Sequence, residues 1–335
     1  MNLSKFPRRI YTPFDTPIQP LDKLTKELGG GARIWMKRDD LLGLAMGGNK
    51  TRKLEYLMAD ALEKDADTII TCGAIQSNHC RLTLAAAVTE GLKCHLVLEE
   101  RIPNSYNKYA GGNNLLYHLL GAEGIYVVDG SIDSMTEVQR VADELTAKGR
   151  KPYIIPGGGS NAIGATGYVR CAQEILRQSS ELCVNFDCVI CTGGSAGTQA
   201  GLIVGFKGEN ADIPVIGISN KSCSIQKKNV LYVVSKLREH LGVDKEITMD
   251  DVIVFDDYIG PGYSISSHEM IDAVKLVART EGIILDPVYT GKTMAGMIDL
   301  YKKGYFKNCE NILFIHTGGT PALFTYTEDF FEDEE

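Results

Sequence analysis

From residue 50 onward, short runs rich in β-branched residues alternate with longer runs whose apolar residues recur at helical spacing. This alternation is typical of helices that cover a mostly parallel sheet. The strand-like runs form two series: residues 68–71, 95–98, 125–128 and 153–155, and then residues 187–191, 215–218, 252–255 and 312–316. The helical runs include residues 54–62, 135–148, 165–177 and 200–206. The sequence therefore predicts an α/β protein with two lobes.

Charge and hydropathy exclude two classes of partner. The 335 residues carry a net charge of −8, which repels nucleic acid and anionic lipid. Two long uncharged stretches, residues 153–169 and 188–206, are rich in Gly, Ser, Thr and Asn instead of being continuously apolar. We therefore expect neither a nucleic-acid partner nor a membrane span.

The first residues and the cysteines bear on the compartment. The N-terminal segment lacks the apolar core of a signal peptide. The nine cysteines are scattered, and the pair at 188 and 191 lies in a strand-like run without the further ligands of a zinc site. We expect reduced thiols, no metal ion and a cytoplasmic location.

Glycine marks the candidate sites, because many of the 35 glycines gather in a few loops. The strongest cluster, residues 192–199, lies between a strand-like run and the helical run 200–206. Small residues that enter a helix present free backbone N–H groups and the positive end of the helix dipole, which favour a phosphate. The alternative is a tight turn without a ligand. A second cluster, residues 157–162, fits a close backbone turn that joins the two lobes better than a dinucleotide-binding fingerprint.

The same loop also matches the G-x-S-x-G pattern of serine hydrolases. In that alternative Ser195 is the nucleophile, and Asp286 and His316 follow in the order of a hydrolase triad. The extra hydroxyl of Thr198 and two polar loops in the N-terminal half argue against it.

Lys50 is a second candidate nucleophile, whose amine could attack an aldehyde. It begins an amphipathic helix in the segment 47–55, where the helix dipole favours the neutral amine and hence attack on an aldehyde. The polar loop 76–79 follows another strand-like run. Pyridoxal phosphate requires three such parts: a nucleophilic lysine, a phosphate site and a loop of hydroxyl and amide groups.

Six motifs carry a resemblance to a known family: residues 37–40, 47–55, 73–79, 194–201, 286–289 and 316–319. The chain resembles the tryptophan synthase β-like (fold type II) pyridoxal phosphate enzymes, within them the D-cysteine desulfhydrase and 1-aminocyclopropane-1-carboxylate (ACC) deaminase group. The resemblance implies two open, mostly parallel twisted sheets flanked by helices. It also implies a small α/β domain, residues 52–160, inserted in a large cofactor-binding domain, residues 1–51 and 161–335. We further expect a homodimer.

The resemblance also assigns roles to residues. It implies that Lys50 binds the cofactor aldehyde covalently, that Asn78 contacts the ring hydroxyl and that Thr317 faces the pyridine nitrogen. The phosphate is expected to be held by Gly194, Ser195, Ala196, Gly197 and Thr198. The substrate carboxylate is expected at Ser77, Asn78 and His79, with Tyr263 and Tyr289 on the reacting side. The expected catalytic residues are Lys50, Ser77, Tyr263 and Tyr289.

Two departures from the deaminases point to the substrate. Those enzymes carry Glu after the Tyr of the Asp-Pro-Val-Tyr motif and Leu before the C-terminal Gly-Gly, whereas this chain has Thr290 and Thr317. We therefore expect a lyase that eliminates sulfide from D-cysteine, a small amino acid. L-cysteate sulfo-lyase, ACC deaminase and a vitamin-binding protein without catalysis are the alternatives, and the residues leave the enantiomer open.

Overall fold

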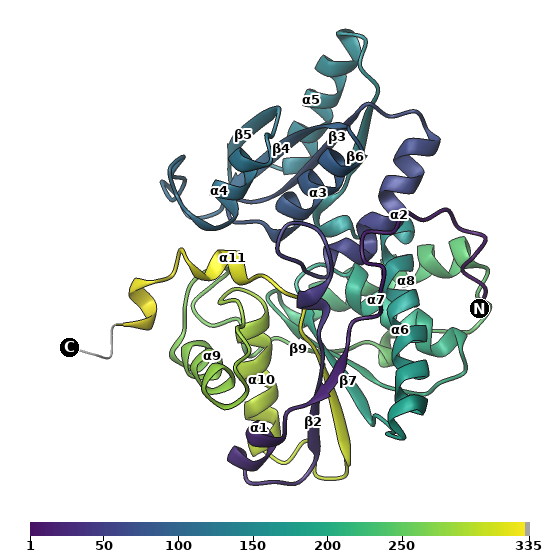
Figure 1. The fold of residues 1–335 in the computed structure, drawn as a ribbon, viewed down its shortest axis with the longest axis vertical. Helices are drawn as coiled ribbons and strands as arrows, with labels where there is room; N and C mark the ends of the chain where they lie inside the picture. Colours follow the sequence, from purple (N-terminus) through teal and green to yellow (C-terminus); the bar gives the residue numbers. More distant parts are fainter. Residues whose placement is uncertain (332–335) are drawn as a thin grey trace.

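The computed structural model describes residues 1–331 and divides its strands between two sheets (Figure 1). The smaller sheet is parallel throughout and has the order β5-β4-β3-β6. Its strands are β3 (Thr68–Ala74), β4 (Lys93–Glu100), β5 (Gly124–Asp129) and β6 (Pro152–Ile155). Helices α2 (Lys50–Glu63), α3 (Asn78–Thr89) and α4 (Gly112–Leu119) share the apolar core on one face, and α5 (Ser134–Ala147) covers the other.

The larger sheet has the order β1-β2-β10-β7-β8-β9, with only the edge strand β1 antiparallel. Its strands are β1 (Ile18–Pro20), β2 (Arg33–Lys37), β7 (Cys188–Gly193), β8 (Val215–Ser219), β9 (Ile253–Phe255) and β10 (Asn311–Ile315). Helices α6 (Ala162–Leu182), α7 (Gly197–Gly208) and α8 (Cys223–Leu241) pack on one face. Helices α1 (Asp22–Glu27), α9 (His268–Glu281) and α10 (Thr290–Lys302) pack on the other. The short α11 (Thr320–Leu323) follows β10.

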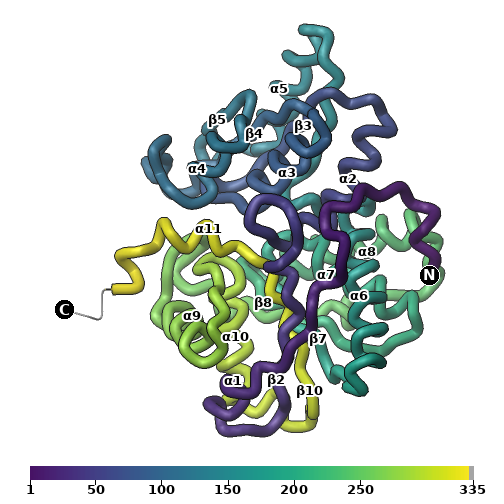
Figure 2. Tube along the Cα trace, in the orientation of Figure 1, coloured from purple at the N-terminus to yellow at the C-terminus, as the bar shows by residue number. Residues whose placement is uncertain are grey.

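The predicted fold class is confirmed, and each predicted strand run corresponds to an observed strand. The tube in Figure 2 follows the chain out of the large sheet through α2, around the small sheet and back through α6. The predicted domain boundaries fall in the first turn of α2 and just before α6.

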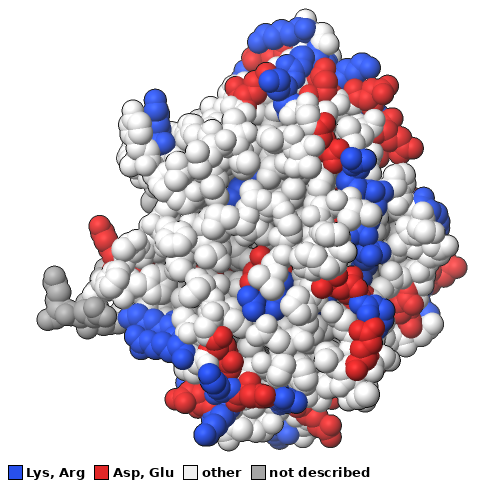
Figure 3. All heavy atoms as spheres, in the orientation of Figure 1, with Lys and Arg blue, Asp and Glu red and all other residues white. Residues whose placement is uncertain are grey.

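Within residues 1–331, every helix is too short or too polar to span a bilayer. Acidic and basic side chains are interspersed on the face shown in Figure 3.

A close crossing joins the two halves. Helix α2 packs against both α3 of the small sheet and α6 of the large one. A Cβ atom added at Gly167, in α6, would lie only 2.2 Å from the backbone carbonyl oxygen of Arg52. Glycine therefore allows the backbone of α6 to pack directly against the first turn of α2, which fixes the start of α2.

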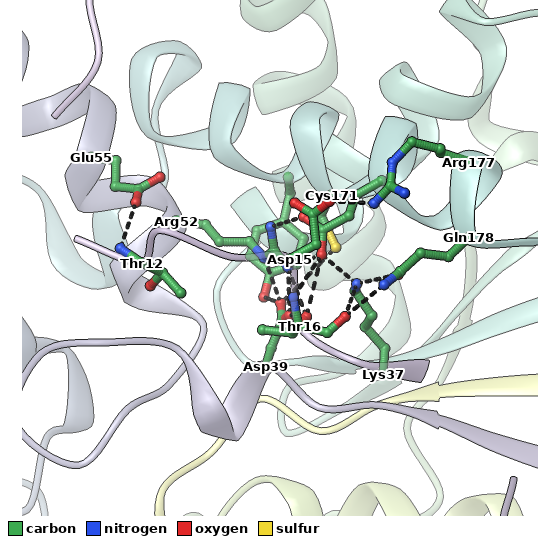
Figure 4. A network of polar contacts seen from close by, with 12 residues as sticks. Thr12, Asp15, Thr16, Lys37, Asp39, Arg52, Glu55, Cys171, Arg177 and Gln178 are labelled. Carbon is green, nitrogen blue, oxygen red and sulfur yellow. Dashed lines mark hydrogen bonds and ion pairs between the residues drawn. The ribbon is translucent and has the colours of Figure 1, made fainter. Parts of the chain in front are cut away.

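Buried ion pairs hold the same place (Figure 4). The guanidinium of Arg52 donates to both carboxylate oxygens of Asp39, at 2.9 and 2.8 Å, and to Oε2 of Glu174 at 2.8 Å. Lys37 pairs with the same Glu174 and donates to the backbone carbonyl of Thr16 at 2.7 Å. Burial alone would raise the pKa of Glu174, but Arg52 and Lys37 outweigh it and lower that pKa to about 2. Two cations and two carboxylates thus tie β2 and the residues after it to α2 and α6.

We expect the Arg52→Met substitution to lower the free energy of unfolding by about 3–5 kcal/mol, because it leaves Asp39 buried without a cation and leaves Glu174 with Lys37 alone. Urea unfolding followed by circular dichroism measures this change. The matched control is Arg177→Met on the exposed side of α6, where pairing with Asp15 and Glu181 is solvated and the loss should stay below about 1 kcal/mol. Equal losses in the two variants would contradict the role given to the buried pairs.

Candidate active site

A cavity of about 270 Å³ lies between the two sheets, at the carboxyl ends of strands from both. Most of the predicted site residues line it: Lys50, Ser77, Asn78, His79, Gly194, Ser195, Thr198, Tyr263, Tyr289 and Thr317. Ala196 and Gly197 belong to the same loop but are buried behind its surface. The structure therefore brings together residues that lie up to 267 positions apart in the sequence.

Lys50 is the first residue of α2, and its amine donates to Oδ1 of Asn49 at 3.0 Å. Asn49 is itself fixed, since its backbone N–H donates to the carbonyl of Thr317 at 3.1 Å and its amide donates to Oγ1 of Thr198 at 3.1 Å. Burial lowers the pKa of Lys50 to about 8, although the charge of Asp286 opposes the shift. Burial thus makes the Lys50 amine easier to deprotonate, which is the direction expected from the helix dipole.

The loop between β7 and α7 forms an open anion site. Ala196 is the N-cap of α7 and has no side-chain acceptor, so most N–H groups of the first turn lack a capping group. The exception is the N–H of Gly197, which donates to Oγ of Ser160 at 3.2 Å. Opposite lies Gly158, where an added Cβ would come within 2.6 Å of Oγ of Ser195. As expected, the glycine turn 157–159 is a place of close backbone approach, here against the anion site.

Lys53 is a site residue that the sequence analysis missed. Its side chain is completely buried, and its amine donates to the carbonyl of Gly158 at 3.0 Å and lies 3.5 Å from Oγ of Ser195. No carboxylate among the described residues pairs with it. Burial and the nearby charge of Lys50 hold its pKa well below the usual value. A phosphate would supply the missing negative charge, so these residues fit a phosphate-bearing cofactor.

The signal for Lys53 was present in the spacing. Residues three apart lie on the same face of a helix, so a lysine three positions after Lys50 points to the same side of α2. Within the segment 47–55 only Lys50 was predicted to be a site residue, although Lys53 lies on the same face of the helix.

The N-terminus of α3 forms the opposite wall. Oγ of Ser77 accepts from the N–H of Cys80 at 3.1 Å and so caps the helix. Oδ1 of Asn78 accepts from the amide of Asn113 at 2.9 Å, which leaves the Asn78 amide nitrogen as a donor near Gly319. The free first-turn N–H groups and the positive end of the dipole suit a carboxylate.

His79 is neutral. Thr71 donates its hydroxyl hydrogen to the carbonyl of Ile155 at 2.8 Å, so Nε2 of His79, 2.8 Å from the same oxygen, carries a hydrogen and donates to it. Burial and then the two lysines hold the pKa of His79 well below its usual value. Its Nδ1 is buried and has no hydrogen-bond partner among the described residues.

Two tyrosines close the cavity on the side of the large sheet. The hydroxyl oxygens of Tyr263 and Tyr289 lie 2.6 Å apart, and burial raises the pKa of both. Asp286 positions the second tyrosine by accepting the backbone N–H groups of Tyr289 at 3.0 Å and Thr290 at 2.7 Å. The guanidinium carbon of Arg101, which the sequence analysis did not single out, lies 4.3 Å from the centre of the Tyr263 ring.

The two threonines that depart from the deaminases have different surroundings. Thr317 lines the cavity. Thr290 is fully buried, donates its hydroxyl to Oδ1 of Asp286 at 2.7 Å and does not line the cavity. Thr290 therefore influences the cavity only through the Asp286 turn, which carries Tyr289.

The structure does not assemble the hydrolase triad. Nε2 of His316 donates to the carbonyl of Ile284 at 3.1 Å, and its Nδ1 accepts the N–H of Gly318 at 3.3 Å. Both nitrogens are thus used by the backbone, and the side chain near Ser195 is Lys53. Asp286 is occupied by its own turn. Ser195 therefore lacks the His–Asp pair that the hydrolase alternative required.

A family model and several solved structures match this chain. The family model described as pyridoxal-phosphate dependent enzyme matches residues 11–318. A crystal structure of an ACC deaminase homologue is 41% identical, covers 98% of this chain and 97% of its own, and has a TM-score of 0.89.

More distant structures share the fold alone. A pyridoxal 5'-phosphate-dependent aspartate racemase is 15% identical, with coverage of 91% and 90% and a TM-score of 0.65. Serine racemase from Dictyostelium discoideum is 18% identical, with coverage of 91% and 92% and a TM-score of 0.63. The chain therefore belongs to the pyridoxal-phosphate-dependent enzymes of the tryptophan synthase β-like fold and, within them, to the ACC deaminase and D-cysteine desulfhydrase family.

Proposed function

We propose that the protein is a β-eliminating carbon–sulfur lyase that converts D-cysteine and water to pyruvate, hydrogen sulfide and ammonia. The observation that carries this proposal is the composition of the reacting side of the cavity: a lysine with a lowered pKa, two hydroxyls in contact at Tyr263 and Tyr289, and a neutral Thr317. Thr317 would offer a neutral hydroxyl to the pyridine nitrogen of bound pyridoxal phosphate, and the ring would then be a milder electron sink than a protonated ring paired with a carboxylate. Such a sink suits expulsion of sulfide, which leaves easily, better than opening of a carbon ring.

Each wall of the cavity has a part in this chemistry. Bound pyridoxal phosphate supplies the electron sink that stabilises negative charge at Cα. The N–H groups at the start of α3, with Ser77 and Asn78, bind the substrate carboxylate and orient the amino acid. Nζ of Lys50 accepts the Cα proton. The hydroxyls of Tyr263 and Tyr289 donate toward the sulfur as it leaves Cβ, and the three-carbon enamine then hydrolyses to pyruvate and ammonia.

We also propose that the enzyme works in the cytoplasm as a homodimer. All nine cysteines are free thiols, which supports a reducing compartment. The homodimer rests on the family resemblance.

We expect the cofactor to bind covalently to Lys50 and not to Lys53. Both amines lose their proton more readily than an ordinary lysine, but of the two only Lys50 lines the cavity. Borohydride reduction of the holoenzyme followed by peptide mass spectrometry locates the adduct. In the apoprotein, the rate of adduct formation should rise as the pH increases through about 8, the pKa at which the Lys50 amine loses its proton. An adduct on Lys53, or a rate that rises only near the pKa of an ordinary lysine, would contradict this assignment.

We expect the Lys50→Ala variant to lose activity by about 100- to 10,000-fold, the usual contribution of a positioned base. Its control is Lys64→Ala on the exposed end of the α2 segment, where the amine pairs with Asp60, and this variant should keep full activity.

A substrate panel tests the reaction. The holoenzyme is incubated separately with D-cysteine, L-cysteine, L-cysteate, D-serine and ACC, and pyruvate, 2-oxobutyrate, sulfide and sulfite are measured. We expect D-cysteine to give pyruvate and sulfide in equal amounts and ACC to give little 2-oxobutyrate. Preferential release of 2-oxobutyrate would replace this proposal with a deaminase.

A further inference from the structure

Tyr263 reaches the cavity from a loop, residues 256–267, that joins β9 to α9. Within residues 1–331, one backbone–backbone hydrogen bond joins two residues of this loop, from the N–H of Ile265 to the carbonyl of Gly262 at 3.4 Å. A loop with so little internal bonding is free to move unless other segments hold it. The place of the Tyr263 hydroxyl, 2.6 Å from that of Tyr289, therefore depends on contacts from outside the loop.

Lys292 makes the strongest of these outside contacts. Its amine donates to the backbone carbonyls of Ile259 and Gly262, each at 2.7 Å. These carbonyls lie four residues and one residue before Tyr263. Lys292 belongs to the first turn of α10, and Tyr289 is the N-cap of that helix. One amine thus joins the loop that carries the first tyrosine to the helix that begins at the second.

The stability of α10 does not explain a lysine at this position. Lys292 is 5% exposed, burial lowers its pKa, and its charge lies at the positive end of the helix dipole. Asp257, Glu269 and Asp299 line a surface hollow of about 370 Å³ beside it, yet no carboxylate within residues 1–331 forms an ion pair with its amine. A buried amine without a carboxylate costs free energy. What the position provides in return is the contact with the loop.

A second tether holds the loop after Tyr263. The hydroxyl of Tyr326 donates to the carbonyl of Ser264 at 2.8 Å, and the hydroxyl of Ser266 donates to Asp329. Ser264 has a φ of 59°, in the left-handed region that is unfavourable for a residue with a Cβ atom. Both partners belong to the segment that follows α11. The loop is therefore held by the α10 amine before the tyrosine and by the C-terminal segment after it.

We propose that Lys292 is a positioning residue that sets the Tyr263 hydroxyl against that of Tyr289 and thereby controls the rate of elimination. Lys292 does not line the cavity, so it acts through the loop and not on the substrate. The inference rests on the proposed function, which assigns the two hydroxyls to the leaving sulfur. Tyr326 has a smaller share in this positioning, because it contributes one hydrogen bond where Lys292 contributes two.

A double-mutant cycle of Lys292→Met and Tyr263→Phe tests the proposal, with the amino acid of the substrate panel that the holoenzyme converts fastest. We expect Lys292→Met alone to lower kcat by about 10- to 100-fold, the effect of a reacting group displaced by about 1 Å. KM should stay within about a factor of three, because the substrate carboxylate binds at the opposite wall. In the Tyr263→Phe background the same substitution should lower kcat less than about twofold, since the hydroxyl that it positions is absent.

Two further variants complete the kinetic test. Lys292→Gln can still donate to one carbonyl, so its kcat should lie between those of the wild type and Lys292→Met. It also serves in the cycle if Lys292→Met does not fold. The matched control is Lys302→Met, which removes an exposed amine from the last turn of α10 and should leave kcat unchanged.

Hydrogen exchange followed by mass spectrometry tests the tether without any substrate. In the Lys292→Met or Lys292→Gln holoenzyme, amides of residues 257–266 should exchange at least about tenfold faster, with the strands of both sheets unchanged. Tyr326→Phe should have a smaller effect on the same amides, and Lys302→Met none.

Equal losses of kcat from the Lys292 substitution in both backgrounds of the cycle would overturn the proposal, because Lys292 would then act other than through Tyr263. Unchanged exchange in residues 257–266 would overturn it as well. A wild-type holoenzyme that eliminates nothing from any amino acid of the panel, while its Lys292 variants exchange faster in this loop, would refute the proposed lyase and leave the positioning of Tyr263 in place.

Discussion

The position of Lys50 depends on the guanidinium of Arg52, two residues further along α2. Arg52 is held by Asp39 and Glu174, which belong to the segment after β2 and to α6. A buried ion pair of this kind contributes little net stability compared with apolar packing, but it tolerates few alternative geometries. The glycine at position 167 lets α6 approach α2, and the ion pairs then fix the start of α2. The reactive amine is therefore positioned by charges that never contact the cavity.

The lining of the cavity has more basic than acidic side chains. Lys53 is fully buried and Lys50 is half-buried, no carboxylate within residues 1–331 is close enough to pair with either, and desolvation lowers the pKa of both. The polypeptide thus carries a desolvation cost that an anionic cofactor relieves when it binds. This arrangement also keeps Lys50 reactive, since a permanent carboxylate partner would hold the proton on its amine. Stability given up at the site is recovered in the surrounding apolar cores.

Sequence patterns predicted the parts of this molecule that depend on local regularity. The strands from residue 68 onward contain continuous apolar runs bounded by turn residues, whereas β2 has arginine and lysine at its ends and was missed. Lys37 is buried there because Glu174, 137 residues away in the sequence, neutralises it. Loops rich in glycine predicted the candidate anion site, and the family resemblance predicted Tyr263, Tyr289 and Thr317, all of which line the cavity. The place of Arg101 over the ring of Tyr263 depends on a long-range contact that no local pattern contains, whereas Lys53 could have been found from its spacing to Lys50. The G-x-S-x-G match shows the converse, because a short motif fits while the contacts of His316 exclude the triad.

The division of the cavity between two sheets has a further consequence for how such an enzyme can change. Its lining combines residues that follow strands of the small sheet, such as Ser77 and Arg101, with residues that follow strands of the large sheet, such as Ser195 and Lys221. A recombinant that inherits its two sheets from different ancestors therefore receives a lining whose halves were never selected together.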